Sequence, residues 1–231
     1  MTKNPQTSLT AKEQAKLFVE LKDLFHNTGQ NSGYDKEDIR SNVFFHCRDF
    51  TVVVLIALIQ MSRVEEKLIS EDEYPLFFGI DNKYAKYTFD HYLQFNRYGY
   101  VTFVMFHIEN CLKIILRELT GKNVNYGYYP ICKNLLDNIT IDNPEKKLDI
   151  LLVPSFMRNS FHSNGIHTKE SCNYVISDYD FEFTKGNTVT CAGWFHIYIM
   201  MKEMINVLKE ILKTKEIQNI TKILPDQYIP N

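Results

Sequence analysis

Residues 158–165, Arg-Asn-Ser-Phe-His-Ser-Asn-Gly, combine side chains that can handle a phosphate group. Arg158 and His162 are four residues apart, so on a helix they lie on the same face. A guanidinium binds phosphate oxygens through paired hydrogen bonds, and a histidine, with an ordinary pKa of about 6.5, exchanges protons near neutral pH. Gly165 favours the left-handed backbone that ends many helices, which places His162 in a last helical turn. This segment is therefore the leading candidate for a catalytic site.

Apolar residues at helical spacing indicate the helices that must position this segment. Thr10 with Glu13 resembles a capping box, and Pro144 suits the first position of the helix that carries the motif at its far end. Pro154 lies inside that helix and is expected to kink or divide it. Residues 70–88 predict an irregular connection. The predicted helices cover residues 10–27, 35–69, 90–119 and 131–139, a stretch from residue 144 to the motif, and residues 192–215.

The segment after Gly165 predicts β structure, because residues 174–183 mix β-forming side chains with partial alternation. Lys-Gly-Asn at residues 185–187 predicts a turn, from which residues 188–190 would return. We therefore expect a short β-hairpin or an extended flap before the last long helix. The predicted fold class is all-α, a helical bundle with antiparallel neighbours and this one β insert.

The chain of 231 residues is expected to form a single domain, residues 1–231, in which residues 1–9 and 224–231 are flexible or extended. Hydrophobic residues make up 45% and charged residues 23%, as in ordinary soluble globular proteins. The strongest apolar run, residues 52–59, is far shorter than the roughly 20 residues of a membrane span, so we interpret it as a buried core helix. These features predict no membrane partner.

The charge and the cysteines argue against several classes of function. The formal net charge of −2 gives no global basic field, so any nucleic-acid contact would need a local patch. The five cysteines are widely spaced and lack a Cys-x-x-Cys pair, which argues against a zinc site or a disulfide framework. The N-terminus lacks the apolar core of a signal peptide. We therefore expect a cytoplasmic protein with reduced thiols, no metal and no cofactor.

The string Arg-Asn-Ser-x-His-x-Asn-Gly, late in a helical chain, resembles the HEPN superfamily (higher eukaryotes and prokaryotes nucleotide-binding). The Phe-Glu-Phe-Thr-Lys-Gly string and the final helix after it strengthen the resemblance. Arg158 and Asn159 match the family's arginine and polar neighbour, and His162 matches its histidine. Three residues separate Arg158 from His162, whereas the family pattern has four to six. Eight residues separate Arg158 from His167, which is more than the pattern allows. The resemblance implies a helical bundle that forms a homodimer.

Many members of this superfamily are metal-independent ribonucleases of toxin–antitoxin, abortive-infection or CRISPR-associated systems. The resemblance therefore implies RNA cleavage through the substrate's own 2′-hydroxyl, which DNA lacks. His162 would act as general base or acid, and Arg158 would hold the scissile phosphate and stabilise the transition state. Asn159 would orient the imidazole or bind a phosphate oxygen. A second motif across the dimer would supply a second histidine, and an antitoxin or regulatory protein would be a further partner.

Each of these roles has a structural alternative. Arg158 could form an ion pair with Glu109 on an earlier helix, and His162 could cap carbonyl groups at the helix end. Asn159 could be an interior hydrogen-bonding residue, and His167 a loop residue. The corresponding alternative function is a non-catalytic module for dimerisation or for binding RNA or protein. A basic rim around Arg158, including Lys169 and Lys185, would favour RNA, whereas a neutral or apolar rim would favour protein binding.

Overall fold

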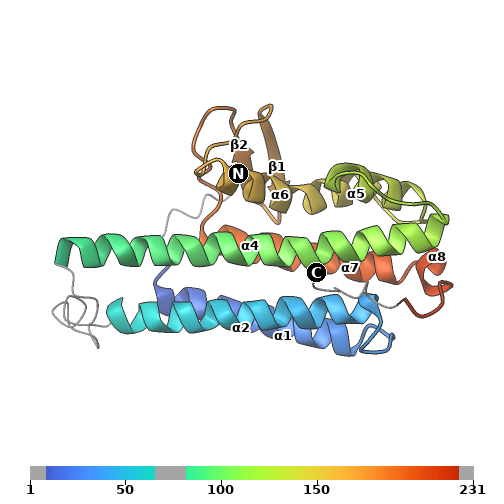
Figure 1. The fold of residues 1–231 in the computed structure, drawn as a ribbon, viewed down its shortest axis with the longest axis horizontal. Helices are drawn as coiled ribbons and strands as arrows, with labels where there is room; N and C mark the ends of the chain where they lie inside the picture. Colours follow the sequence, from blue (N-terminus) through green and yellow to red (C-terminus); the bar gives the residue numbers. More distant parts are fainter. Residues whose placement is uncertain (1–8, 66–81, 224–231) are drawn as a thin grey trace, which may run out of the picture.

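The computed structural model describes residues 9–65 and 82–223, and it is predominantly helical (Figure 1). The predicted fold class, an all-α bundle with a short β-hairpin before the last long helix, is confirmed. The elements in chain order are the helices α1 (Ala11–Gln30), α2 (Ile39–Glu65), α4 (Asn82–Thr120), α5 (Tyr128–Asp137) and α6 (Pro144–His162), the strands β1 (Cys172–Ile176) and β2 (Tyr179–Phe183), and the helices α7 (Trp194–Leu212) and α8 (Lys215–Gln218).

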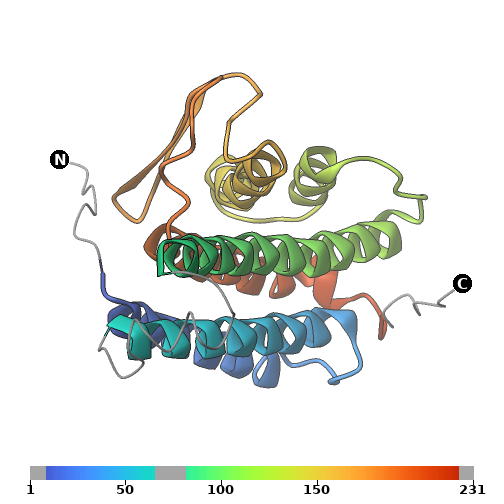
Figure 2. The same ribbon diagram turned by 60° about the vertical axis from the view of Figure 1, so that its left-hand side comes forward.

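The helices form three layers, which Figures 1 and 2 show from two sides. One layer holds α1 and α2, the middle layer holds α4 and α7, and the third holds α5 and α6 with the hairpin beside them. Buried hydrophobic side chains from all three layers join in one continuous cluster. The long helix α4 packs against α2 on one side and against α5 and α6 on the other. Side chains on α6 therefore meet α4 directly.

Most helix ends lie within a few residues of the prediction, and the capping box at Thr10 and Glu13 is confirmed. The irregular connection is wrong for residues 82–88, which form the first turns of α4, because that stretch contains no glycine or proline to end a helix. Its remaining part, and the predicted helical residues 66–69, lie outside the described residues. The same holds for the predicted flexible ends at residues 1–9 and 224–231, Leu9 excepted.

Pro154 does not divide α6, which runs as one helix from Pro144 to His162. The predicted division does not occur because the residues around the proline are held by packing. Leu151, Leu152, Val153 and Met157 are all buried in the core, and their burial outweighs the one backbone hydrogen bond that a proline removes.

The hairpin turn lies at Ser177 and Asp178, inside the predicted β stretch of residues 174–183, so the prediction that residues 185–187 turn the hairpin is wrong. Both residues have positive φ values, 50° and 68°, as the two-residue turn with the twist of a hairpin requires. Serine and aspartate are weaker signals for this turn than Asn-Gly, which is why the sequence did not indicate it. Residues 185–187 do form a turn, after which Thr188 pairs with Ile166 in an isolated bridge.

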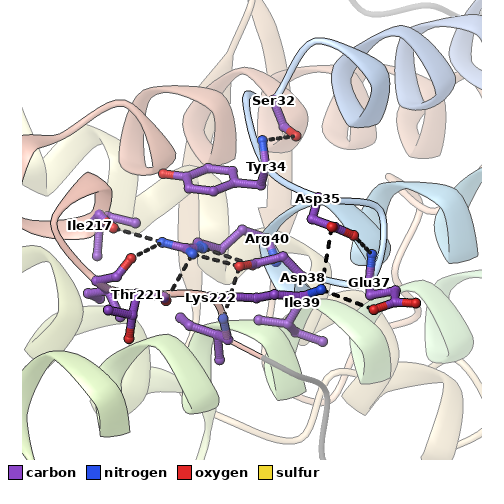
Figure 3. A network of polar contacts seen from close by, with 12 residues as sticks. Ser32, Tyr34, Asp35, Glu37, Asp38, Ile39, Arg40, Ile217, Thr221 and Lys222 are labelled. Carbon is purple, nitrogen blue, oxygen red and sulfur yellow. Dashed lines mark hydrogen bonds and ion pairs between the residues drawn. The ribbon is translucent and has the colours of Figure 1, made fainter.

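A buried ion pair between Asp38 and Arg40 fastens the end of the described chain to the start of α2 (Figure 3). Arg40 Nη2 lies 2.6 Å from Asp38 Oδ2, and both side chains are only 2% exposed. The guanidinium also lies over the ring of Tyr34, 3.9 Å from its centre. The remaining donors of Arg40 bind backbone carbonyl oxygens after α7, those of Ile217, Ile220 and Thr221.

The interpretation of residues 52–59 as a buried core helix holds for only one side of the helix. Val54, Leu55, Ala57 and Leu58 are buried, but the other four side chains of the run are exposed. On the adjacent α4, Phe95, Phe103 and Phe106 are 76%, 52% and 61% exposed. Phe103 stacks on Phe50 of α2 with ring centres 4.9 Å apart, which joins the two helices. We call this set the apolar surface: Val52, Val53, Ile56, Ile59, Phe95, Phe103 and Phe106.

Two stretches of α2 and α4, Ile39–Arg63 and His91–Thr120, are long and apolar enough to span a membrane. About half of the most apolar part of each, 44% and 56%, is buried inside the bundle. Core helices of soluble proteins share this property, so the absence of a membrane partner stays a prediction.

Candidate functional site

The motif lies at the end of α6, as predicted. The helix ends at His162, and Asn164 and Gly165 then adopt left-handed backbone conformations with φ of 55° and 83°. The Gly165 N–H donates to the carbonyl oxygen of Ser160 over 2.8 Å, which closes the last turn. The predicted role of Gly165 in ending the helix is confirmed, and Asn164 shares the left-handed conformation.

The Gly165→Ala substitution is expected to lower the free energy of unfolding by about 1 kcal/mol, because an L-residue resists a φ of 83°. The new Cβ would lie 3.8 Å from the Tyr98 hydroxyl oxygen, an ordinary contact, so backbone strain accounts for the loss. The measurement is urea denaturation followed by circular dichroism. Gly99→Ala is the matched control, since Gly99 lies in a helix with open space around it and alanine should stabilise it. Equal effects of the two substitutions would contradict this reading.

Arg158 forms the ion pair with Glu109 that the sequence offered as the alternative to a catalytic role. Arg158 Nη1 donates to Glu109 Oε2 on α4 over 2.8 Å, and both side chains are partly exposed. This bond uses only one of the five N–H groups of a guanidinium. No other hydrogen bond of Arg158 is seen within the described residues. Glu109 therefore fixes the position of the guanidinium and leaves most of its donors available.

His162 is exposed at the end of α6, on the same side of the helix as Arg158. The alternative that it caps carbonyl groups receives no support in the described part of the chain, where backbone N–H groups of Ser163, Asn164 and Gly165 bind the last carbonyl oxygens. Asn159 is partly buried, and within the same residues it makes no hydrogen bond to the imidazole. The helix thus brings the three motif residues to one side without direct bonds between them.

His167 is a buried structural residue, although the sequence suggested an ordinary loop position. Its side chain is 2% exposed, and its ring packs between those of Phe156 and Phe183 under the hairpin. Its Nε2 lies 3.0 Å from the carbonyl oxygen of Glu170. His167 is therefore bound into the base of the hairpin, away from any role as the motif's histidine.

The rim near the motif is mixed in charge. It is neither the basic rim that would favour RNA nor the neutral or apolar rim that would favour protein binding. Lys185 Nζ lies 2.6 Å from Glu170 Oε1, so this lysine is already paired, and Lys169 is exposed. A pair this exposed is weak, and an RNA phosphate could replace the carboxylate. Lys169 and Lys185 are thus present near the motif, but together they do not form a strongly basic surface.

The cysteines have the character of core residues. All five are free, and four of them are buried. Burial raises the pKa of the Cys132 and Cys191 thiols to about 12, which keeps them protonated and unreactive near neutral pH. Across residues 9–65 and 82–223, no group of three His, Cys, Asp or Glu side chains gathers in a way that could hold a metal ion.

The chain matches no protein-family model, no curated protein and no solved structure.

Proposed function

We propose that the chain is a HEPN-like, metal-independent endoribonuclease with Arg158 and His162 as its catalytic pair. The observation that carries the proposal is the arrangement at the end of α6. Glu109 holds the Arg158 guanidinium through a single N–H over 2.8 Å, and the exposed His162 lies one helical turn further on the same side. A fixed cation beside an accessible imidazole suits a reaction at a phosphodiester.

In this reaction His162 takes the proton of a ribose 2′-hydroxyl, and the 2′-oxygen attacks the adjacent phosphorus. The 5′-oxygen leaves and accepts a proton, so the products are a 2′,3′-cyclic phosphate and a free 5′-hydroxyl. Arg158 stabilises the added negative charge on the phosphoryl oxygens, and Asn159 binds one of those oxygens. One imidazole cannot give and take a proton in the same step, so a homodimer with two motifs supplies both base and acid.

The test is to incubate the purified protein with total RNA in EDTA and to identify the ends of any fragments. The proposal expects cleavage with cyclic phosphate ends by the wild type, and none by the Arg158→Ala, His162→Ala double variant. Cleavage by both proteins would show a contaminant or another site. If neither cleaves while both are folded and dimeric, the non-catalytic alternative takes its place. The roles as a cytoplasmic toxin or antiphage effector, with an antitoxin or regulatory partner, depend on the first outcome.

The alternative function, a non-catalytic assembly module, is favoured by the apolar surface of α2 and α4. With about 150–250 Å² for a whole aromatic side chain, its exposed atoms amount to an area on the order of 600 Å². That is at the upper end for the largest patch of a monomer, and it approaches the roughly 800 Å² that each partner contributes to a stable interface. A second copy of the chain is the occupant that this area suits, and the same dimer would serve the ribonuclease.

Phe106→Asp is expected to weaken this dimer at least about tenfold, because a carboxylate would be buried against apolar side chains. Phe106 is 61% exposed, so the monomer should keep its fold. The measurement is sedimentation equilibrium over a range of concentrations. Val175→Asp is the control, since Val175 is 54% exposed but lies on β1, away from this surface. A wild type that is monomeric throughout, or a Phe106→Asp protein that dimerises normally, would rule this surface out as the interface.

A further inference from the structure

A pocket of about 250 Å³ lies where α4 meets the end of α6 and the segment that leads into α7. It contains neither Arg158 nor His162, so it is separate from the catalytic pair proposed above. At roughly 30 Å³ per water molecule, its volume equals that of about eight waters. Its walls are formed by Gln94, Arg97, Tyr98, Phe161, Asn164, Gly165, Thr188, Val189, Thr190, Ala192 and Gly193.

Arg97 is the one charged residue among these lining residues, and it has no partner in the described part of the chain. Its Nε is buried without a hydrogen bond, and no ion pair or hydrogen bond of its guanidinium is seen within residues 9–65 and 82–223. Burial lowers the pKa of Arg97 from its ordinary value. A charge that is taken out of water without a counterion is destabilising, so it needs a compensating role.

The comparison with Arg40 shows how this fold treats an arginine with a structural role. Arg40 is more deeply buried than Arg97, but the Asp38 carboxylate and three carbonyl oxygens satisfy its guanidinium. No carboxylate takes that place at Arg97, because no aspartate or glutamate lines its pocket. The missing acceptor is therefore expected to come from a bound molecule.

The other polar groups of the pocket include several hydrogen-bond donors. Thr188 and Thr190, which carry hydroxyl groups, are part of the wall. The Tyr98 hydroxyl accepts a hydrogen bond from the Gln94 amide, so its own proton is free to be donated. Gly193 directly precedes the 19-residue helix α7 and offers no side-chain cap, which leaves the first N–H groups of that helix unsatisfied by a side chain. The partial positive charge at this helix start adds to that of Arg97.

We propose that this pocket binds the phosphoryl group of a small molecule, with the Arg97 guanidinium as its charged contact. A phosphate presents several acceptor oxygens in different directions and thus suits a site with one guanidinium and several neutral donors. The volume leaves room for an attached group beside the phosphate. The proposal stands whether or not the chain cleaves RNA, since none of the catalytic residues takes part.

The test uses inorganic phosphate and adenosine monophosphate as probes, with sodium chloride at matched ionic strength as the reference. At a probe concentration about tenfold above its Kd, the thermal unfolding midpoint of the full chain should rise by about 3 °C over the chloride reference. An equal rise with both probes would identify free phosphate as the ligand, and a larger rise with the nucleotide would identify a phosphate ester. No rise with either probe would overturn the proposal.

Arg97→Met should abolish this phosphate-dependent rise. In buffer without phosphate its midpoint should equal or exceed that of the wild type, because the substitution removes an unpaired, partly buried charge. Arg63→Met is the matched control, since it removes the same charge from an exposed position and should keep the full rise. Arg97→Lys, which keeps the charge, should retain a reduced rise. A full rise in Arg97→Met would overturn the proposal, and so would a large loss of stability without phosphate in both Arg97 variants.

Discussion

Replacing Asp38 with alanine is expected to lower the free energy of unfolding by about 3–5 kcal/mol. Asp38 is the only carboxylate in contact with the buried Arg40 among the described residues, and its removal leaves that cation uncompensated. The substitution also removes Asp38 Oδ1, the acceptor that caps the start of α2 by binding the backbone N–H of Arg40. Guanidinium denaturation measures this effect. A loss below about 1 kcal/mol would show that the pair contributes no more than a surface ion pair.

The double variant Asp38→Leu, Arg40→Met is the control that distinguishes the loss of the ion pair from the cost of leaving Arg40 charged and unpaired. An apolar pair of similar volume leaves no buried charge, so it should recover much of the stability that Asp38→Ala loses. The double variant should still loosen the end of the described chain near Ile223. In the wild type the Ile223 N–H donates to Asp38 Oδ2, and the Arg40 guanidinium donates to carbonyl oxygens of the residues before Ile223, and the double variant lacks both contacts. Faster hydrogen exchange at Ile223 in both variants is the measurement that checks this part.

The same pair makes stability depend on pH. Burial alone raises the pKa of Asp38, but the hydrogen bonds from Arg40 and from backbone N–H groups outweigh it, so the pKa lies below its ordinary value. A carboxylate whose pKa is lower in the folded state stabilises the fold above its unfolded pKa of about 3.9. This contribution is lost as the pH falls below about 4, toward the folded pKa. The wild type should therefore lose more stability below pH 4 than the double variant.

The sequence allows the helices to be predicted because their signals are local. Caps such as Thr10 with Glu13, the proline at position 144 and the helix end at Gly165 each depend on residues within a few positions. The pairing of Arg158 with Glu109 is a long-range contact that could also be anticipated, since a partly buried arginine needs a carboxylate and few lie on the facing helix. These signals are sufficient to predict the fold class and the position of the motif at a helix end.

The features that escaped prediction depend on contacts between distant parts of the chain. Whether residues 52–59 are buried depends on which side of α2 receives α1 and α4, and periodicity leaves both sides apolar. Arg40 finds its carbonyl partners 177 and more positions along the chain. Arg97 stands out only when the structure shows that no residue of the described ranges pairs with it. The chemistry of an arginine is thus set by its partners, which the sequence does not display.

His162→Ala is expected to reduce the rate of RNA cleavage by about 10²–10⁴-fold, because it removes the proton-transfer group. Stability should change little, since the His162 side chain is exposed. The measurement is kcat/KM on a defined RNA oligonucleotide in EDTA, with cleavage compared over pH 5–9 in the wild type. A rate that persists in His162→Ala would remove this residue from the mechanism.

Glu109→Gln separates the positioning of Arg158 from its catalysis. Arg158→Ala should reduce cleavage by about 10²–10³-fold, as expected for the loss of a group that stabilises transition-state charge. Glu109→Gln keeps an acceptor oxygen near Arg158 Nη1, so it should lower cleavage far less than Arg158→Ala does. If the ion pair were only structural, the two substitutions would lose stability through the same partly buried pair, and neither would affect cleavage. Loss of cleavage in Arg158→Ala without a matching loss of stability would therefore assign the arginine to the reaction.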